Sequence, residues 1–221
     1  MSSGRQHLAL GVGRGPRRGW LLVATLAASE TTAYGVLAYA FGVFLVPMQQ
    51  ELGWSRTALT GAYALAIIVS GVAAIPVGRW LDRHGARALM TTGACAASLL
   101  VLAWAQVSDL AVFYTIWVGI GLTMAAVLYE PAFAVIASWY RDAAQRNRAL
   151  LGLTVIAGFA SVIYVPLAGL LVQTHGWRHA LVVLAALLAV LTRAPQRHPA
   201  WPATRPARPA SGRPGHRADR G

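Results

Sequence analysis

The stretch TALTGAYALAIIVSGVAAIPVGRWL, residues 57–81, is mostly apolar and is followed at once by the charged segment DRHGAR, residues 82–87. A helix that crosses the hydrocarbon core of a bilayer needs about 20 consecutive, mostly apolar residues. Residues 57–81 meet this length, and the charged segment marks the point where the chain leaves the membrane. The stretch therefore predicts a transmembrane helix.

Further apolar stretches lie on both sides of this one, separated by charged or polar breaks: 20–47, 88–106, 110–139, 148–173 and 178–192. The composition agrees, because 57% of the 221 residues are hydrophobic and only 12% are charged. A typical soluble domain has about 25% charged residues. We therefore expect an all-α membrane protein with six transmembrane helices, formed by residues 20–192 between tails at 1–19 and 193–221.

The arginines predict the orientation in the membrane. Of the 19 basic residues, 17 lie in the N-terminal tail, the 79–87 loop, the 140–148 loop and the tail after the last span, and only Arg56 and Arg178 lie on the other face. Cytoplasmic loops carry the excess of Lys and Arg. The sequence thus predicts a multi-pass protein of the cell membrane, in a bacterium the inner membrane, with both termini in the cytoplasm.

The tail at 193–221 is dominated by Arg, Pro, Ala and Gly and has no apolar period. Such a segment cannot bury enough apolar surface to fold, so we expect it to be disordered. Its abrupt change of character is typical of truncation or of translation out of frame. The alternative is a basic segment that is attracted to anionic lipid beside the membrane.

Several function classes are disfavoured by the residues present. The net charge of +12 sits in loops and tails, which indicates the positive-inside pattern and no nucleic-acid partner. We find no HExxH motif, no paired-glutamate motif and no serine nucleophile with a mid-span His, so we expect no enzyme, no metal and no cofactor. Cys95 is the single cysteine, within an apolar run, and is expected to be a packing residue.

An internal repeat appears when the sequence is shifted by 91 residues, because His84-Gly85-x-Arg87 then lies over His175-Gly176-x-Arg178. Three spans separate the two copies, an odd number, so the copies run through the membrane in opposite directions. Inverted three-plus-three repeats recur among secondary transporters. The predicted fold is therefore an inverted repeat of three helices plus three.

The loop GRWLDRHGARALM, residues 78–90, resembles the loop motif Gly-x-x-x-Asp-Arg/Lys-x-Gly-x-Arg/Lys of the major facilitator superfamily. The matching residues are Gly78, Asp82, Arg83, Gly85 and Arg87. The segments 41–71, 129–150 and 176–178 are similar to the bacterial monocarboxylate and oxalate/formate branch. The resemblance covers residues 20–192 and implies the N-terminal six-helix half of the fold, with a small organic anion as substrate.

The same loop is expected to act as a conformational latch. Asp82 can pair with arginines of the 140–148 loop, which are Arg141, Arg146 and Arg148. The family resemblance implies that such a latch also engages a second six-helix half and stabilises the outward-open state. The alternative is a positively charged cytoplasmic loop with a turn and no further role.

Glu30 and Glu130 are the acidic residues well inside predicted spans, the first and the fourth. A charge at this depth costs about 2.5–3.5 kcal/mol, so such residues usually face a cavity or a partner. We predict that one of them couples proton movement to substrate movement. The nearby Tyr34, Tyr39 and Tyr129 are candidates for hydrogen bonds to substrate, with packing, or a helix kink for the carboxyls, as the alternative. No Arg lies mid-span.

The predicted function is secondary active transport of a small solute by alternating access, as a proton-coupled symporter of an organic anion. Its partners would be lipid, the substrate, and a second six-helix half or a second copy that closes the cavity. The alternative is a truncated or frameshifted half-transporter without activity of its own. Self-association separates the two hypotheses, because a working half needs a partner.

Overall fold

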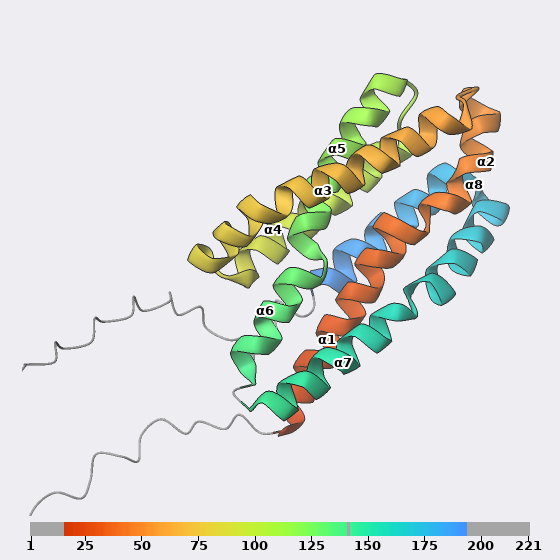
Figure 1. Cartoon of the computed structure of the whole chain (residues 1–221). Coiled ribbons are helices and arrows are strands. Elements are labelled where there is room, and N and C mark those ends of the chain that lie inside the picture. The colour runs from red at the N-terminus through yellow and green to blue at the C-terminus, as the bar shows by residue number, and fades with distance from the viewer. Residues whose placement is uncertain (1–15, 141, 194–221) are drawn as a thin grey trace, which may run out of the picture.

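The computed structural model describes residues 16–140 and 142–193, apart from the side chains of Pro16, Arg18, His84, Tyr129 and Arg193. Every regular element in these ranges is a helix (Figure 1). In chain order they are α1 (Pro16–Tyr34), η1 (Gly35–Tyr39), α2 (Phe41–Leu52), α3 (Arg56–His84), α4 (Ala86–Ala105), α5 (Leu110–Val127), α6 (Tyr129–Trp139), α7 (Ala143–Gly158) and α8 (Ala160–Arg193). The predicted tails fall almost entirely outside the described residues, so their boundaries stay a prediction.

Long apolar helices confirm a chain built to cross a membrane repeatedly. Five segments are long and apolar enough: Gly19–Leu52, Arg56–Arg83, Ala86–Ala105, Leu110–Trp139 and Ala143–Thr192. The last has 50 residues, which at 1.5 Å per residue would be about 75 Å long as one helix. Its helical backbone is interrupted at Gly176 (φ 77°, ψ 163°), and there the chain turns back along the bundle (Figure 1). The five segments therefore include one that doubles back on itself.

Short polar residues begin the helices, as the sequence favours. Ser55 accepts a hydrogen bond from the backbone N–H of Ala58, and Asp109 accepts from two N–H groups of α5. Asp142 does the same for α7 through the N–H of Gln145, at 2.8 Å. These side chains satisfy donors that have no partner inside their own helix. Three of the charged or polar loops of the sequence thus also supply a helix cap.

Three of the long segments are irregular within the bundle. The first contains the π-helical turn η1 between α1 and α2. The fourth breaks at Leu128 (φ −83°, ψ −166°), three residues before Pro131, whose ring cannot sit over an intact helical turn. In the segment after residue 143, the break is at Phe159 (ψ 0°), and Pro166 lies inside α8. Irregular backbone at membrane depth is tolerated where it is buried in protein or lines a cavity.

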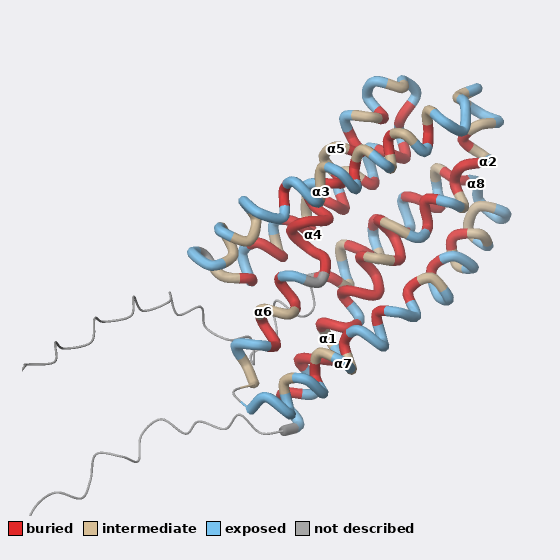
Figure 2. The backbone as a smooth tube through the Cα atoms, viewed as in Figure 1, coloured by how far each residue is buried: buried red, intermediate tan, exposed pale blue. Residues whose placement is uncertain are grey.

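Aromatic side chains fill one half of the core. Trp104 and Trp117 are fully buried, with ring centroids 4.9 Å apart in an edge-to-face arrangement. Phe41 packs on Trp117 at 4.8 Å. Many large apolar side chains are exposed, including Ile68 and Val72 of α3, and Figure 2 shows exposed stretches along α3 and α7 in pale blue. Burial inside and apolar exposure outside is the pattern of a helix bundle in contact with lipid.

Close packing of backbones joins α3 to α5. A Cβ atom added at Gly121 would lie 2.5 Å from the carbonyl oxygen of Ala66, so only glycine permits this approach. Figure 1 shows α1 alongside α7 and against α8, while α3, α4 and α5 form the other side of the bundle. The two sides meet mainly where α4 packs against α8.

Candidate functional site

A cavity of about 390 Å³ lies where the irregular turns of the bundle come together. Its walls come from η1 and the end of α1, from α3, and from the junction of α5 and α6. The lining residues are Tyr34, Ala38, Tyr39, Tyr63, Ile67, Ser70, Met124, Leu128 and Glu130. The cavity therefore has three phenol side chains, one hydroxyl and one carboxyl on an otherwise apolar wall.

Two of the predicted tyrosines are brought together in this cavity. The ring centroids of Tyr34 and Tyr39 are 6.4 Å apart, and both rings line the wall. Tyr129 begins α6 at the same level, but its side chain is outside the described part of the chain. The sequence reading missed Tyr63, which stacks on Phe41 at 4.8 Å with the ring planes 11° apart. Tyr63, Ile67 and Ser70 have helical spacing and share one face of α3, but in a stretch that is apolar almost throughout this spacing does not show which face lines a cavity.

The two predicted carboxyls have different surroundings. Glu130 lies in the first turn of α6, is exposed, and lines the cavity. Glu30 is fully buried in α1, and neither of its carboxyl oxygens has a hydrogen-bond partner among the described residues. The hydroxyls beside it in sequence are engaged, because Thr31 donates to Ala27 and Thr32 donates to Ala28.

Burial of an unpaired charge is costly, so Glu30 is most stable at this position as a neutral carboxylic acid. The structure thus places one predicted carboxyl on the cavity wall and buries the other within α1.

The loop motif is at the end of the bundle where α3 passes into α4. Asp82 and Arg83 are exposed in the last turn of α3, Gly85 has a positive φ of 81°, and Arg87 is exposed in the first turn of α4. Gly78 lies half-buried within α3, with no atom within 4 Å of an added Cβ.

The predicted partners of the motif are on α7 and just before it. Arg146 is half-buried and Arg148 is exposed, both in α7. Within the described ranges no ion pair joins Asp82 to either arginine, and Arg141 lies outside those ranges. The latch therefore stays a prediction.

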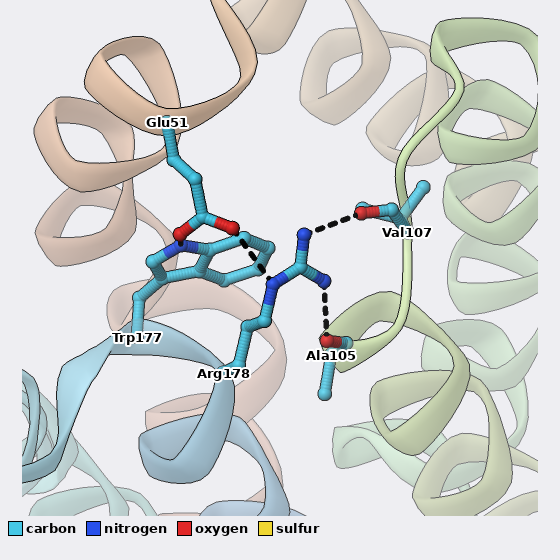
Figure 3. A network of polar contacts seen from close by, with 5 residues as sticks. All are labelled: Glu51, Ala105, Val107, Trp177 and Arg178. Carbon is cyan, nitrogen blue, oxygen red and sulfur yellow. Dashed lines mark hydrogen bonds and ion pairs between the residues drawn. The ribbon is translucent and has the colours of Figure 1, made fainter.

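A polar network ties three segments together at the opposite end of the bundle (Figure 3). Arg178 donates from Nε to Glu51 at 2.9 Å and from its two Nη atoms to the backbone carbonyls of Ala105 (2.8 Å) and Val107 (3.0 Å). Trp177 donates from its indole N–H to the other oxygen of Glu51 at 2.5 Å. The guanidinium also lies over the Trp177 ring, 4.3 Å from its centroid.

This network joins the end of α2, the end of α4 and the run of α8 after Gly176. From the sequence, Arg178 was predicted only to lie on the face poor in arginine, with no partner. The pairing of Arg178 with Glu51 spans 127 residues, and no local pattern indicates which distant carboxylate an arginine will meet.

The bundle consists of long apolar helices, some of which are interrupted beside one small cavity. This architecture is that of a multi-pass α-helical membrane protein. The family model of the Major Facilitator Superfamily matches residues 23–215. The chain belongs to this family of membrane transporters.

Similar relatives are monocarboxylate transporters. The chain is 32% identical to monocarboxylate transporter 11 of Homo sapiens over 180 residues, and this match covers 79% of the chain and 36% of the relative. It is 31% identical to monocarboxylate transporter 11 of Mus musculus, covering 79% and 38%. With monocarboxylate transporter 13 of Rattus norvegicus it shares 26% identity over 174 residues, covering 76% and 39%. The matches therefore span a little over a third of the relatives' own length.

Proposed function

We propose that this chain is a six-helix half of a secondary transporter that moves a small organic monoanion together with a proton. The observation that carries the proposal is the cavity of about 390 Å³ at the helix breaks, with tyrosines and one carboxyl on its wall. Such a volume suits a small solute. Membership of the Major Facilitator Superfamily and the names of the relatives support the same class of substrate.

Two features of the cavity favour an anion. Tyr34, Tyr39 and Tyr63 can donate phenol hydroxyls to a carboxylate. Helix α6 starts at the cavity wall, and the N-terminal end of a helix carries partial positive charge. Half-helices in transporters direct this end at anionic substrate groups. The lining residues include no Arg or Lys, so the anion would be held by hydroxyls and the helix dipole.

Glu130 supplies the link between anion and proton. An ionised carboxylate on the cavity wall repels an anionic substrate, whereas the protonated form does not. Binding of substrate and binding of a proton then favour each other by the same coupling free energy. Glu30, which is buried in α1 with no hydrogen-bond partner for its carboxyl among the described residues, is the second carboxyl inside the predicted spans. This pair is our candidate for the proton pathway.

The proposal includes six transmembrane helices as an inverted three-plus-three repeat, with both termini in the cytoplasm. The chain reverses at Gly85 and again at Gly176, and the two glycines have nearly the same backbone, φ 81° and ψ 163° against φ 77° and ψ 163°. The shift of 91 residues described above aligned these two glycines with each other. The excess of arginine at the loops around Gly85 supports a cytoplasmic position for that end.

Alternating access requires a partner that covers the cavity. Two of its wall residues, Tyr39 and Ile67, are 44% and 46% exposed, which leaves the cavity accessible from the side of α3. A second six-helix half or a second copy of the chain would cover it, and the motif at Asp82 would latch onto that partner. The alternative is that the chain is a truncated or frameshifted half without activity of its own.

Uptake into liposomes tests the proposal. The 221-residue chain is reconstituted and uptake of radiolabelled pyruvate is measured with and without an outside-acid pH gradient. We expect the gradient to accelerate uptake, and Glu130→Gln to remove the acceleration. Cross-linking in the same liposomes reports whether the chain self-associates. Uptake no faster than in protein-free liposomes, from folded protein, would contradict independent transport and favour the inactive half.

A further inference from the structure

The π-helical turn η1 puts two cavity residues side by side that an ordinary helix would separate. The backbone N–H of Ala40 donates to the carbonyl of Gly35, five residues back, at 2.8 Å. In an α-helix each residue adds about 100°, so residues five apart point about 140° away from each other. Tyr34 and Tyr39 are five apart, yet their ring centroids are only 6.4 Å apart.

Tyr164 of α8 packs directly against this turn. A Cβ atom added at Gly35 would lie 2.2 Å from Cγ of Tyr164, so the ring occupies the space beside the glycine. Tyr164 is buried. Its hydroxyl donates to the Oγ1 of Thr32 at 2.8 Å, one turn before η1. The ring and hydroxyl therefore contact span 1 both at the start of the π-turn and just ahead of it.

A second contact fixes the same stretch of α1 to the neighbouring segment. Thr31 donates to the carbonyl of Ile156 at 3.3 Å, close to the break at Phe159. A π-turn is rare and costs free energy relative to a regular helix, and such turns occur frequently at functional sites. The contacts with Tyr164 and Ile156 offset that cost in this bundle.

We infer that Tyr164 is a positioning residue for the cavity: it holds span 1 in the π-turn and so keeps Tyr34 and Tyr39 together on the wall. Tyr164 does not line the cavity itself. Without its ring, span 1 returns to a regular α-helix, and the residues after Gly35 rotate relative to those before it by about 100°. Tyr39 then leaves the wall. The inference rests on the proposed function only in taking the cavity as the substrate site.

Cross-linking tests the geometry without any transport assay. In the full chain with Cys95→Ser, we compare the double variant Tyr34→Cys/Tyr39→Cys with Tyr34→Cys/Ala38→Cys, using dibromobimane, which fluoresces when it bridges two thiols. Residues four apart are neighbours in an α-helix, so the second pair should react in either geometry. The pair Thr91→Cys/Ala96→Cys, five apart in the regular helix α4, is the matched negative control.

We expect the 34/39 pair to be bridged several-fold more than the 91/96 pair, and nearly as well as the 34/38 pair. Adding Tyr164→Ala should lower 34/39 bridging to the level of the 91/96 pair and leave 34/38 bridging unchanged, which also shows that the chain remains folded. Tyr164→Phe keeps the ring and should restore most of the 34/39 signal.

Two results would overturn the inference: 34/39 bridging no better than 91/96, or 34/39 bridging unaffected by Tyr164→Ala. Neither depends on pyruvate uptake, so failure of the proposed transport and failure of this positioning role can be told apart. Where uptake is measurable, Tyr164→Ala should raise KM for pyruvate.

Discussion

At each end of the bundle the chain reverses at a glycine with almost the same backbone conformation, but the arginine that follows has different contacts at the two ends. Gly85 and Gly176 share a conformation that is nearly restricted to glycine, and each is followed two residues later by an arginine. Arg178 is held by a carboxylate and two carbonyls (Figure 3). Arg87 is exposed and has no ion pair within the described residues.

The difference shows that the repeat preserves backbone geometry but not the electrostatic contacts. At the Gly176 end, the network ties three segments of this chain to each other. At the Gly85 end, the charged side chains of Asp82, Arg83 and Arg87 remain exposed. A closed end and an end left available for a partner fit a half-transporter whose cytoplasmic latch acts on a second half, as we propose.

The largest effect is expected from Arg178→Ala. It removes three hydrogen bonds from a cation and leaves two backbone carbonyls and one oxygen of Glu51 without their donor. Because the Arg178 side chain is 32% exposed, water replaces part of this, and we expect a loss of about 3 kcal/mol in unfolding free energy. Denaturant titration in mixed micelles measures it. Arg87→Ala is the matched control and should cost less than about 0.5 kcal/mol; equal losses would contradict the contrast.

Next in size are the glycines. Gly176→Ala and Gly85→Ala force a side chain into a backbone region that costs about 2 kcal/mol. No atom lies within 4 Å of a Cβ at Gly176, so its cost is purely conformational. Gly71→Ala, at a helical glycine with the same open space, should be neutral or stabilising because alanine favours helix. The melting temperatures of the two variants measure these costs. Unequal decreases for Gly85→Ala and Gly176→Ala would contradict the inference that the two glycines share one backbone conformation.

A smaller effect is expected from Glu51→Gln. The amide has a single acceptor oxygen, so it can keep the hydrogen bond from Arg178 or the one from Trp177 but not both, and the ionic part of the contact is lost as well. Because the Glu51 side chain is half exposed, water replaces part of the lost contacts, and we expect a loss of about 1 kcal/mol in unfolding free energy. Added salt should lower the stability of the parent chain and leave the variant nearly unchanged, because salt screens exposed charges. A loss of unfolding free energy as large as that of Arg178→Ala would mean that the negative charge of Glu51 supplies most of the stabilisation of the network.

The smallest effect is expected from Asp82→Asn in the isolated chain. Asp82 is exposed and makes no ion pair with Arg146 or Arg148, so its unfolding free energy should change by less than about 0.5 kcal/mol. The same substitution should weaken association with a second half or second copy, measured by cross-linking yield. A clear loss of stability in the chain by itself would place a partner of Asp82 within it.

The local features of the fold could be predicted from the sequence. Apolar length predicted the helices, and the capping residues Ser55, Asp109 and Asp142 lie at the predicted breaks. Family membership followed from the loop motif and is confirmed by the match over residues 23–215. Of the candidate site, Tyr34, Tyr39 and Glu130 line the cavity, whereas Glu30 is buried within α1. Tyr63 was missed because one tyrosine in an apolar stretch gives no signal of which face it occupies.

What the sequence determines by itself is what depends on neighbours along the chain. Hydrophobic length, arginine distribution, caps and the two His-Gly-x-Arg turns need no distant contact. Tertiary structure alone decided the π-turn, because Tyr164 must arrive beside Gly35 from 129 residues away to hold it. It also decided that Arg178 meets Glu51 and that Arg87 stays exposed. A backbone conformation is encoded locally, whereas the partner of a side chain depends on which helices pack against each other.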